Sequence, residues 1–72
     1  MTQSEHRTLI RRLEVQAKSA RTRMNNVQAL GTRDLSPRMT RLMYRTVMSA
    51  QNATGRLTRE RMSYRMRYGV DA

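Results

Sequence analysis

Apolar residues recur through the first part of the chain at the spacing of an α-helix. The gaps between them alternate between three and four residues, and the positions are Ile10, Leu13, Ala17, Ala20, Met24 and Val27. This alternation is the a and d pattern of a coiled-coil seam. Thr2 and Glu5 have the spacing of a capping box, and Gly31 is suited to end a helix because a left-handed cap needs no Cβ. The pattern therefore predicts a first helix over about residues 4–30.

A second helix is predicted after Ser36, whose hydroxyl can cap the first turn. Pro37 suits the first helical position, where the N–H that it lacks would be unpaired in any case. Further along, one face of this helix carries Met39, Leu42, Met43, Thr46, Ala50, Ala53, Leu57 and Tyr64. With Gly69 as its end, the helix spans about residues 37–68 and residues 31–36 form a turn. Two long helices and a short turn indicate an all-α, antiparallel helical hairpin, with residues 1–72 as one small domain.

The middle of the second helix contains residues that disfavour a helix. Asn52, Thr54 and Gly55 follow one another closely, and glycine costs about 1 kcal/mol relative to alanine inside a helix. A break near Gly55 would turn the hairpin into three helices. The apolar spacing stays in phase from Ala50 to Leu57, which favours a continuous or merely bent helix.

Composition limits how stable such a hairpin can be alone. The 72 residues include only eleven Leu, Ile and Val and no Phe, while 15 Lys and Arg face 5 Asp and Glu, for a formal net charge of +10. Few aliphatic residues and a high net charge are typical of chains that cannot bury much apolar surface by themselves. We therefore expect the hairpin to assemble into a homo-oligomer or a larger complex.

Side chains that donate hydrogen bonds form a line along one side of the second helix, at gaps of three or four residues, and six of them are arginines. We call the following set the basic line: Arg38, Arg41, Arg45, Arg56, Arg59 and Arg67. Ser49, Asn52 and Ser63 occupy the positions between them. A shorter line on the first helix holds Arg7, Arg11, Lys18 and Asn25. It is interrupted by Glu14, which we expect to pair with Lys18 at the i, i+4 spacing.

The excess of arginine points to phosphate as the ligand. Arginine presents a planar fork that can bond two phosphate oxygens, and 14 of the 15 cations are arginine. A charged face opposite an apolar seam can be an ordinary solvated face. Such faces usually mix signs, however, because a net charge of +10 on a small body is self-repulsive. The nine cationic residues of the two lines are therefore the candidate nucleic-acid-binding residues.

A second apolar group lies on the side of the second helix away from its partner: Tyr44, Met48, Met62 and Met66. We interpret this group as a protein–protein interface, although single exposed apolar residues are common on any surface. Tyr44, Tyr64 and Tyr68 could instead stack on unpaired bases. Tyr64 and Tyr68, four residues apart, fit a packed pair at the helix end equally well.

Catalytic and metal-binding patterns do not occur in the sequence. It has no Cys, and its one histidine, His6, is expected to be a solvated residue of the first turn, so neither a metal site nor a cofactor is expected. The five carboxylates show no catalytic spacing, and we expect no enzymatic activity. No apolar run reaches the length of a membrane span, and no leader segment is recognisable.

The leading hypothesis is therefore a non-enzymatic helical protein that binds the phosphate backbone of DNA or RNA without sequence preference. It would act inside an assembly, as a packaging, virion or ribonucleoprotein component, in the cytoplasm or a virion. The main alternative is a small structural or inhibitory protein whose arginine face docks on an acidic protein. A basic helix lying on anionic lipid is less favoured, because such helices usually carry Trp, Phe or Leu on the apolar side.

Overall fold

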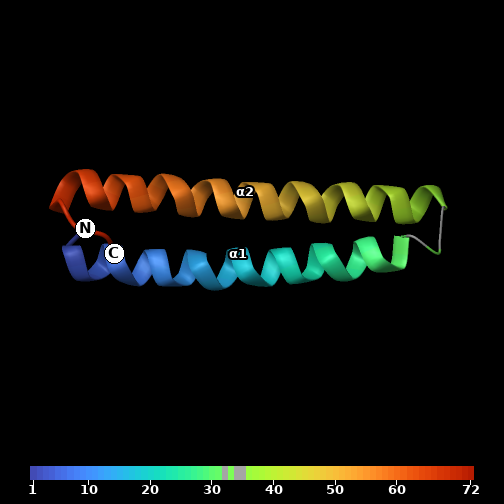
Figure 1. The fold of residues 1–72 in the computed structure, drawn as a ribbon, viewed down its shortest axis with the longest axis horizontal. Coiled ribbons are helices and arrows are strands. Elements are labelled where there is room, and N and C mark those ends of the chain that lie inside the picture. The colour runs from blue at the N-terminus through green and yellow to red at the C-terminus, as the bar shows by residue number, and fades with distance from the viewer. Residues whose placement is uncertain (32, 34–35) are drawn as a thin grey trace.

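The protein is a pair of long antiparallel helices. The computed structural model describes residues 1–31, 33 and 36–72, and it contains α1 (Gln3–Gly31) and α2 (Pro37–Tyr68). The helices lie side by side along a body of 48 × 16 × 14 Å, and both chain termini lie at the same end (Figure 1). The predicted helical hairpin is confirmed. Of its predicted turn, residues 32, 34 and 35 lie outside the described part of the chain.

The helix ends follow from local capping. The Thr2 hydroxyl accepts a hydrogen bond from the Glu5 N–H at 3.1 Å, which begins α1 one residue before the expected start. At the start of α2 the Ser36 hydroxyl accepts from the Met39 N–H at 3.2 Å, and Pro37 occupies the first helical position. Gly69 ends α2 in the left-handed conformation, with φ at 72° and its N–H donated to the Arg65 carbonyl. Only glycine adopts this conformation without strain from a Cβ.

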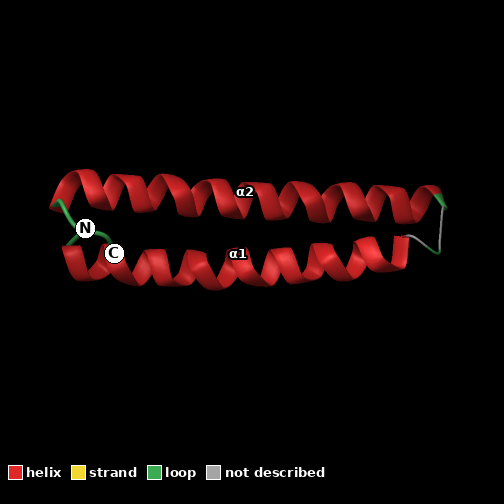
Figure 2. Cartoon of the chain, viewed as in Figure 1, coloured by secondary structure: helices red, strands yellow, loops and turns green. Residues whose placement is uncertain are grey.

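Helix α2 runs without a break through Gly55, and the three-helix alternative is wrong (Figure 2). Ala50 and Leu57 are both buried against α1, one on each side of Gly55. Burial of in-phase side chains on both sides keeps the helix continuous, because tertiary packing outweighs the weak helix preference of single residues.

The core is a narrow seam between the helices. Its most buried residues on α1 are His6, Ile10, Leu13, Ala17, Ala20 and Val27, and those on α2 are Thr46, Ala50, Leu57 and Tyr64. Leu42 was expected in this seam but is 42% exposed. It lies with Ala20 and Arg23 along a shallow groove, and the small Ala20 side chain cannot cover a leucine.

His6 is a core residue, and the expectation that it is solvated is wrong. It is 3% exposed, and its Nε2 lies 2.9 Å from a Glu60 carboxylate oxygen. Its ring packs edge-on against Tyr64 and Tyr68, with ring centroids 5.3 and 6.2 Å apart. His6 precedes Ile10 by four residues, so it continues the a and d seam back to the first turn of α1. The open end of the hairpin is thereby closed by aromatic and polar side chains.

Tyr64 links the two helices through its hydroxyl. This oxygen accepts hydrogen bonds from Gln3 Nε2 at 3.0 Å and from Arg7 Nε at 2.8 Å. The side chain is fully buried, and its ring centroid lies 4.7 Å from that of Tyr68. A buried ring presents no face to a base, so the stacking hypothesis is wrong for Tyr64. The packed pair at the helix end is the observed arrangement.

Candidate nucleic-acid interface

All six arginines of the basic line are exposed. Successive residues of an α-helix are turned by about 100°, so the six side chains occupy one flank of α2, between its buried side and its outermost side. None of them forms an ion pair within the described residues, where the ion pairs are His6–Glu60, Glu14–Arg61 and Arg65–Asp71. The Arg41 Nε atom donates to the Pro37 carbonyl at 3.5 Å. The flank therefore offers guanidinium groups that are without a carboxylate partner within the described residues and can bind an external anion.

The opposite flank of α2 has a different character. It carries Thr40, Thr54 and Thr58, and its two arginines each meet a carboxylate. Arg61 lies 3.0 Å from Glu14 on α1, and Arg65 lies 3.3 Å from Asp71 beyond the helix end. These pairs are exposed and contribute little to stability. Glu14 and Asp71 therefore place their negative charge on the side away from the basic line, whereas Glu5 and Glu60 lie on the side of the basic line.

The structure does not bring the two cationic lines together. Glu14 pairs with Arg61 and not, as expected, with Lys18. Its position shows which side of α1 faces the opposite flank of α2. Arg7, Arg11 and Lys18 share that side of α1, since each lies within about 60° of Glu14 around the helix axis. Arg7 is also engaged, because its Nε donates to the Tyr64 hydroxyl.

Two arginines that the sequence analysis did not select complete the flank of the basic line. Arg23 lies with Arg45 and Ser49 along the groove between the helices. Arg12 precedes Arg23 by eleven residues, which is about three full turns, so it shares the same side of α1. The signal was present in the sequence: both residues immediately precede a core position, as Arg45 and Arg56 do. The antiparallel arrangement places such positions of the two helices next to each other.

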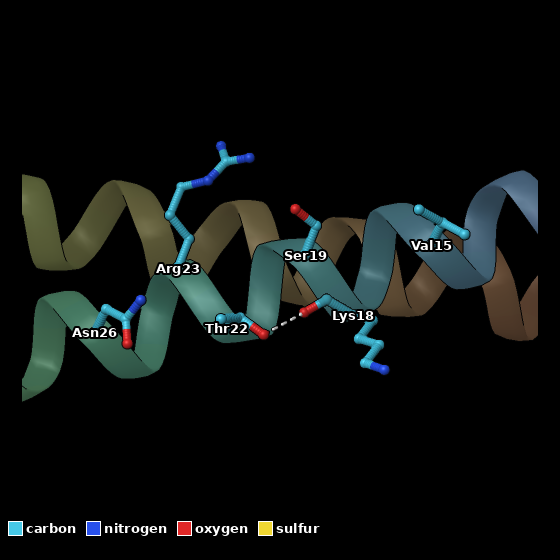
Figure 3. Close-up of a pocket in the computed structure, with 6 residues that line it drawn as sticks. All are labelled: Val15, Lys18, Ser19, Thr22, Arg23 and Asn26. Carbon is cyan, nitrogen blue, oxygen red and sulfur yellow. Dashed lines mark hydrogen bonds between the residues drawn. The ribbon is translucent and has the colours of Figure 1, made fainter.

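The hollows on the two helices are shallow, and basic side chains stand among the residues that line them. Arg38, Arg41, Leu42 and Arg45 line one of them. Another lies on the outside of α1 (Figure 3), where Arg23 and Lys18 extend in opposite directions. There the Thr22 hydroxyl donates to the Lys18 carbonyl at 3.0 Å, so it is already engaged. The chemistry available is hydrogen-bond donation and positive charge, spread along the helices.

The predicted interface residues are exposed on the outside of α2. Tyr44 is 68% exposed, Met48 37%, Met62 59% and Met66 84%. Met62 and Met66 lie beside Arg59 and Arg67 along a shallow hollow. This apolar surface has no cover within the described chain.

Neither described helix has an apolar stretch that is long enough to cross a membrane. Within the same residues, no three His, Asp or Glu side chains gather as a metal-ion site would require. Comparison of the chain with protein-family models, with curated proteins and with solved structures finds no match.

Proposed function

We propose that this protein binds the phosphate backbone of nucleic acid along one flank of its hairpin. The observation that carries the proposal is the basic line itself: its six arginines are exposed and form no ion pair within the described residues. Glu14 and Asp71 pair with arginines of the opposite flank, and Glu60, which lies beside the basic line, contacts His6. A solvated face that served only solubility would need no such line of arginines. A concentrated field of one sign attracts a polyanion over a distance and holds it by charge-assisted hydrogen bonds.

The length of the surface fits a long polyanion. Arg38 and Arg67 are 29 residues apart on one continuous helix, which corresponds to about 43 Å at a rise of about 1.5 Å per residue. Duplex DNA presents about one phosphate charge per 1.7 Å of its axis. Arginines spaced along the helix would therefore contact several phosphates over its length. Contacts of this kind position a protein on nucleic acid without reading its sequence.

The proposed role is structural and non-enzymatic. The uncovered apolar side chains of α2 and the narrow core support a protein that works inside an assembly. A packaging or virion component, or a component of a ribonucleoprotein in the cytoplasm, would use both features together.

The test is the salt dependence of binding. Fluorescent duplex DNA, single-stranded DNA and RNA are titrated with nuclease-treated protein at several salt concentrations. If six arginines contact phosphates, the logarithm of the association constant falls with a slope of about −5 against the logarithm of the salt concentration. That slope weakens duplex binding about a thousandfold between 50 and 200 mM salt. A flat dependence, or no binding at low salt, would refute the proposal, and retention of an acidic protein after nuclease treatment would favour the alternative.

Two matched triple variants locate the surface. Arg45, Arg56 and Arg59 are replaced by Gln in the first, and Arg11, Lys18 and Arg21 in the second, so both lose three positive charges. The first variant should lower the magnitude of the salt slope by about 2.7, since each phosphate contact contributes about 0.9. It should weaken all sequences about equally. The second variant should change the slope by less than half as much, and equal effects of the two would contradict the assignment to this flank.

A further inference from the structure

The exposed apolar residues of α2 are arranged symmetrically about Gly55. We call the following residues the outer stripe: Tyr44, Met48, Gly55, Met62 and Met66. Met48 and Met62 lie seven residues before and after Gly55, and Tyr44 and Met66 lie eleven residues before and after it. At about 100° per residue, all four side chains point within about 20° of the direction of Gly55. They form a straight line on the side of α2 opposite the core.

Gly55 has no role within the hairpin that requires glycine. It lies in an unbroken helix, and a Cβ added there would meet only the Arg59 guanidinium at 3.7 Å, an ordinary contact. Glycine is a poorer helix former than alanine. What glycine does permit is the close approach of another backbone. Once the flexible Arg59 side chain turns aside, the centre of the outer stripe is the point on α2 that a second helix can approach most closely.

We infer that the outer stripe is the contact with a second copy of this chain, packed antiparallel with the two-fold axis at Gly55. In a two-fold contact, a residue at a given distance before the axis meets the partner's residue at the same distance after it. Met48 then packs against the partner's Met62, and Tyr44 against the partner's Met66. Every apolar residue of the outer stripe finds an apolar residue opposite, which an arbitrary partner would not provide.

Charge supports a second copy in this register. Arg41 lies fourteen residues before Gly55 and Gly69 fourteen residues after it. Arg41 is thus placed at the end of the partner's α2, where helix carbonyls favour a cation. In a parallel pair, by contrast, Arg41 and Arg59, which lie within about 40° of the centre of the outer stripe, would each face their own copy at the same height. Like charges in direct opposition disfavour that arrangement.

The flanks of the contact are also compatible with the antiparallel register. Arg59 and Asn52 lie on the same flank of α2 at nearly equal distances after and before Gly55. The two-fold axis places Arg59 beside the partner's Asn52, and Arg45 beside the partner's Ser63 by the same reasoning. Arg59 and Arg45 therefore each have a neutral polar side chain of the partner beside them, and Arg45 also lies near the height of the partner's Arg67.

The size of the outer stripe sets the expected affinity. Tyr44 and Met66 are 22 residues apart, so the contact is about 33 Å long at about 1.5 Å per residue. Apolar patches of this kind amount to several hundred Å², which is below the roughly 800 Å² per partner of a standard interface. We therefore expect a reversible dimer that forms at micromolar concentrations.

This inference rests on the proposed function in one respect: the dimer is the assembly in which the protein would bind nucleic acid. The two-fold axis keeps the same flank of both copies on the same face of the dimer. Both basic lines then lie side by side on one face, which doubles the number of arginines available to one polyanion. Dimerisation itself needs no nucleic acid and can be measured without it.

The first test is sedimentation of nuclease-treated protein between about 1 and 500 µM. A monomer–dimer equilibrium is expected, and a chain that stays monomeric throughout would overturn the inference. The Gly55→Leu variant should weaken dimerisation at least tenfold, while improving helix propensity, so loss of dimer cannot be attributed to unfolding. Val15→Leu, at an exposed position of α1, is the matched control and should leave dimerisation unchanged. A Gly55→Leu protein that dimerises as well as the native chain would also overturn the inference.

The second test fixes the register. The chain contains no cysteine, so single cysteines introduced by Met48→Cys and Met62→Cys report on one contact each. Under oxidation an equal mixture of the two variants should form a cross-linked dimer. Neither variant alone should do so, because its own copies lie about 21 Å apart in this register. Cross-linking of each variant with itself, without any mixed cross-link between the cysteines at positions 48 and 62 in the mixture, would show a parallel contact and overturn the proposal.

The two proposals fail separately. The Arg45, Arg56 and Arg59 triple variant should still dimerise in the absence of nucleic acid. Gly55→Leu should still bind nucleic acid with an unchanged number of phosphate contacts per chain. Loss of salt-dependent binding with an intact dimer would refute the proposed function alone, and the reverse result would refute only the two-fold contact.

Discussion

The Nε2 atom of His6 lies 2.9 Å from a carboxylate oxygen of Glu60, and this contact joins the first turns of α1 to the last turns of α2. The His6 Nδ1 atom is buried without a hydrogen-bond partner within the described residues. A neutral imidazole that donates its Nε2–H to Glu60 fits this arrangement, since Nδ1 then carries no proton that lacks an acceptor. The His6 ring also packs against Tyr64 and Tyr68. At the end of the hairpin that holds both termini, His6 therefore joins the helices by ring packing and by its contact with Glu60.

Replacement of His6 by alanine should destabilise the hairpin by about 2 kcal/mol, because it removes a buried ring and leaves Glu60 without its partner. The measurement is the free energy of unfolding in urea, at one fixed protein concentration. Glu60→Gln keeps an acceptor for Nε2 and should cost less than about 1 kcal/mol. If His6→Ala cost no more than Glu60→Gln, the packing role of the ring would be wrong.

Tyr64 should ionise at a lower pH than an ordinary tyrosine. The hydrogen bond from Arg7 lowers the pKa of its hydroxyl, burial opposes this by raising it, and the Gln3 hydrogen bond and the charge of Arg7 lower it further. Ultraviolet absorbance of tyrosinate measured against pH should show one early transition below pH 10.0. Tyr64→Phe should remove this transition, whereas Tyr44→Phe should leave it in place. An early transition that survived Tyr64→Phe would contradict the assignment.

The same lowered pKa predicts how stability depends on pH. A tyrosine whose pKa is lower in the folded than in the unfolded state binds fewer protons when folded, so its contribution to stability grows as pH rises. That contribution is fully present above the unfolded value of 10.0 and is lost as pH falls through the lowered pKa. The difference in unfolding free energy between the native chain and Tyr64→Phe should therefore increase as pH rises from the lowered pKa to 10.0. A difference that stays constant across it would refute the linkage.

Loss of the Ser36 cap should weaken the start of α2. Its hydroxyl accepts the Met39 N–H, and the loss of a serine N-cap typically costs about 1 kcal/mol. Ser36→Ala is compared in thermal unfolding with Ser63→Ala, which removes an exposed hydroxyl from the interior of the same helix. Ser63→Ala should be neutral or slightly stabilising, because alanine is the better helix former. Equal melting temperatures of the two variants would contradict a capping role.

The seam should be far more sensitive to truncation than the surface. Leu13 is 2% exposed and Leu30 is 58% exposed on the same helix. Leu13→Ala should cost about 2–5 kcal/mol, since the buried site loses apolar contacts and a cavity remains. Leu30→Ala should change stability by less than about 1 kcal/mol. Both are measured by chemical denaturation, and similar losses would show that the narrow core does not dominate the stability of the hairpin.

Local sequence signals account for most of the fold. The alternating apolar gaps from Ile10 to Val27, the Ser36–Pro37 start and the Gly69 end each act within a few residues of themselves. They predicted two long helices and an antiparallel hairpin, because helix periodicity and capping are local properties of the chain. The same local logic failed at His6. A lone polar residue in the first turn looks solvated until its position is counted as part of the seam.

Where a side chain contacts the other helix, its partner and its burial were decided only by the tertiary structure. Lys18 is four residues from Glu14, yet Glu14 meets Arg61, 47 residues away in sequence. Tyr64 is buried because α1 supplies Gln3 and Arg7 as donors to its hydroxyl. No local pattern contains that information.

The amino-acid sequence alone determined the two helices, their direction relative to each other and the one-sided excess of arginine on α2. Only the packed hairpin decided which flank of α1 adjoins that arginine: Arg12 and Arg23 lie there, and Arg11 and Lys18 do not. The physical reason is that helical periodicity assigns each residue an angle around its own axis. Which face of each helix is turned towards the other is set by the seam that both helices bury together.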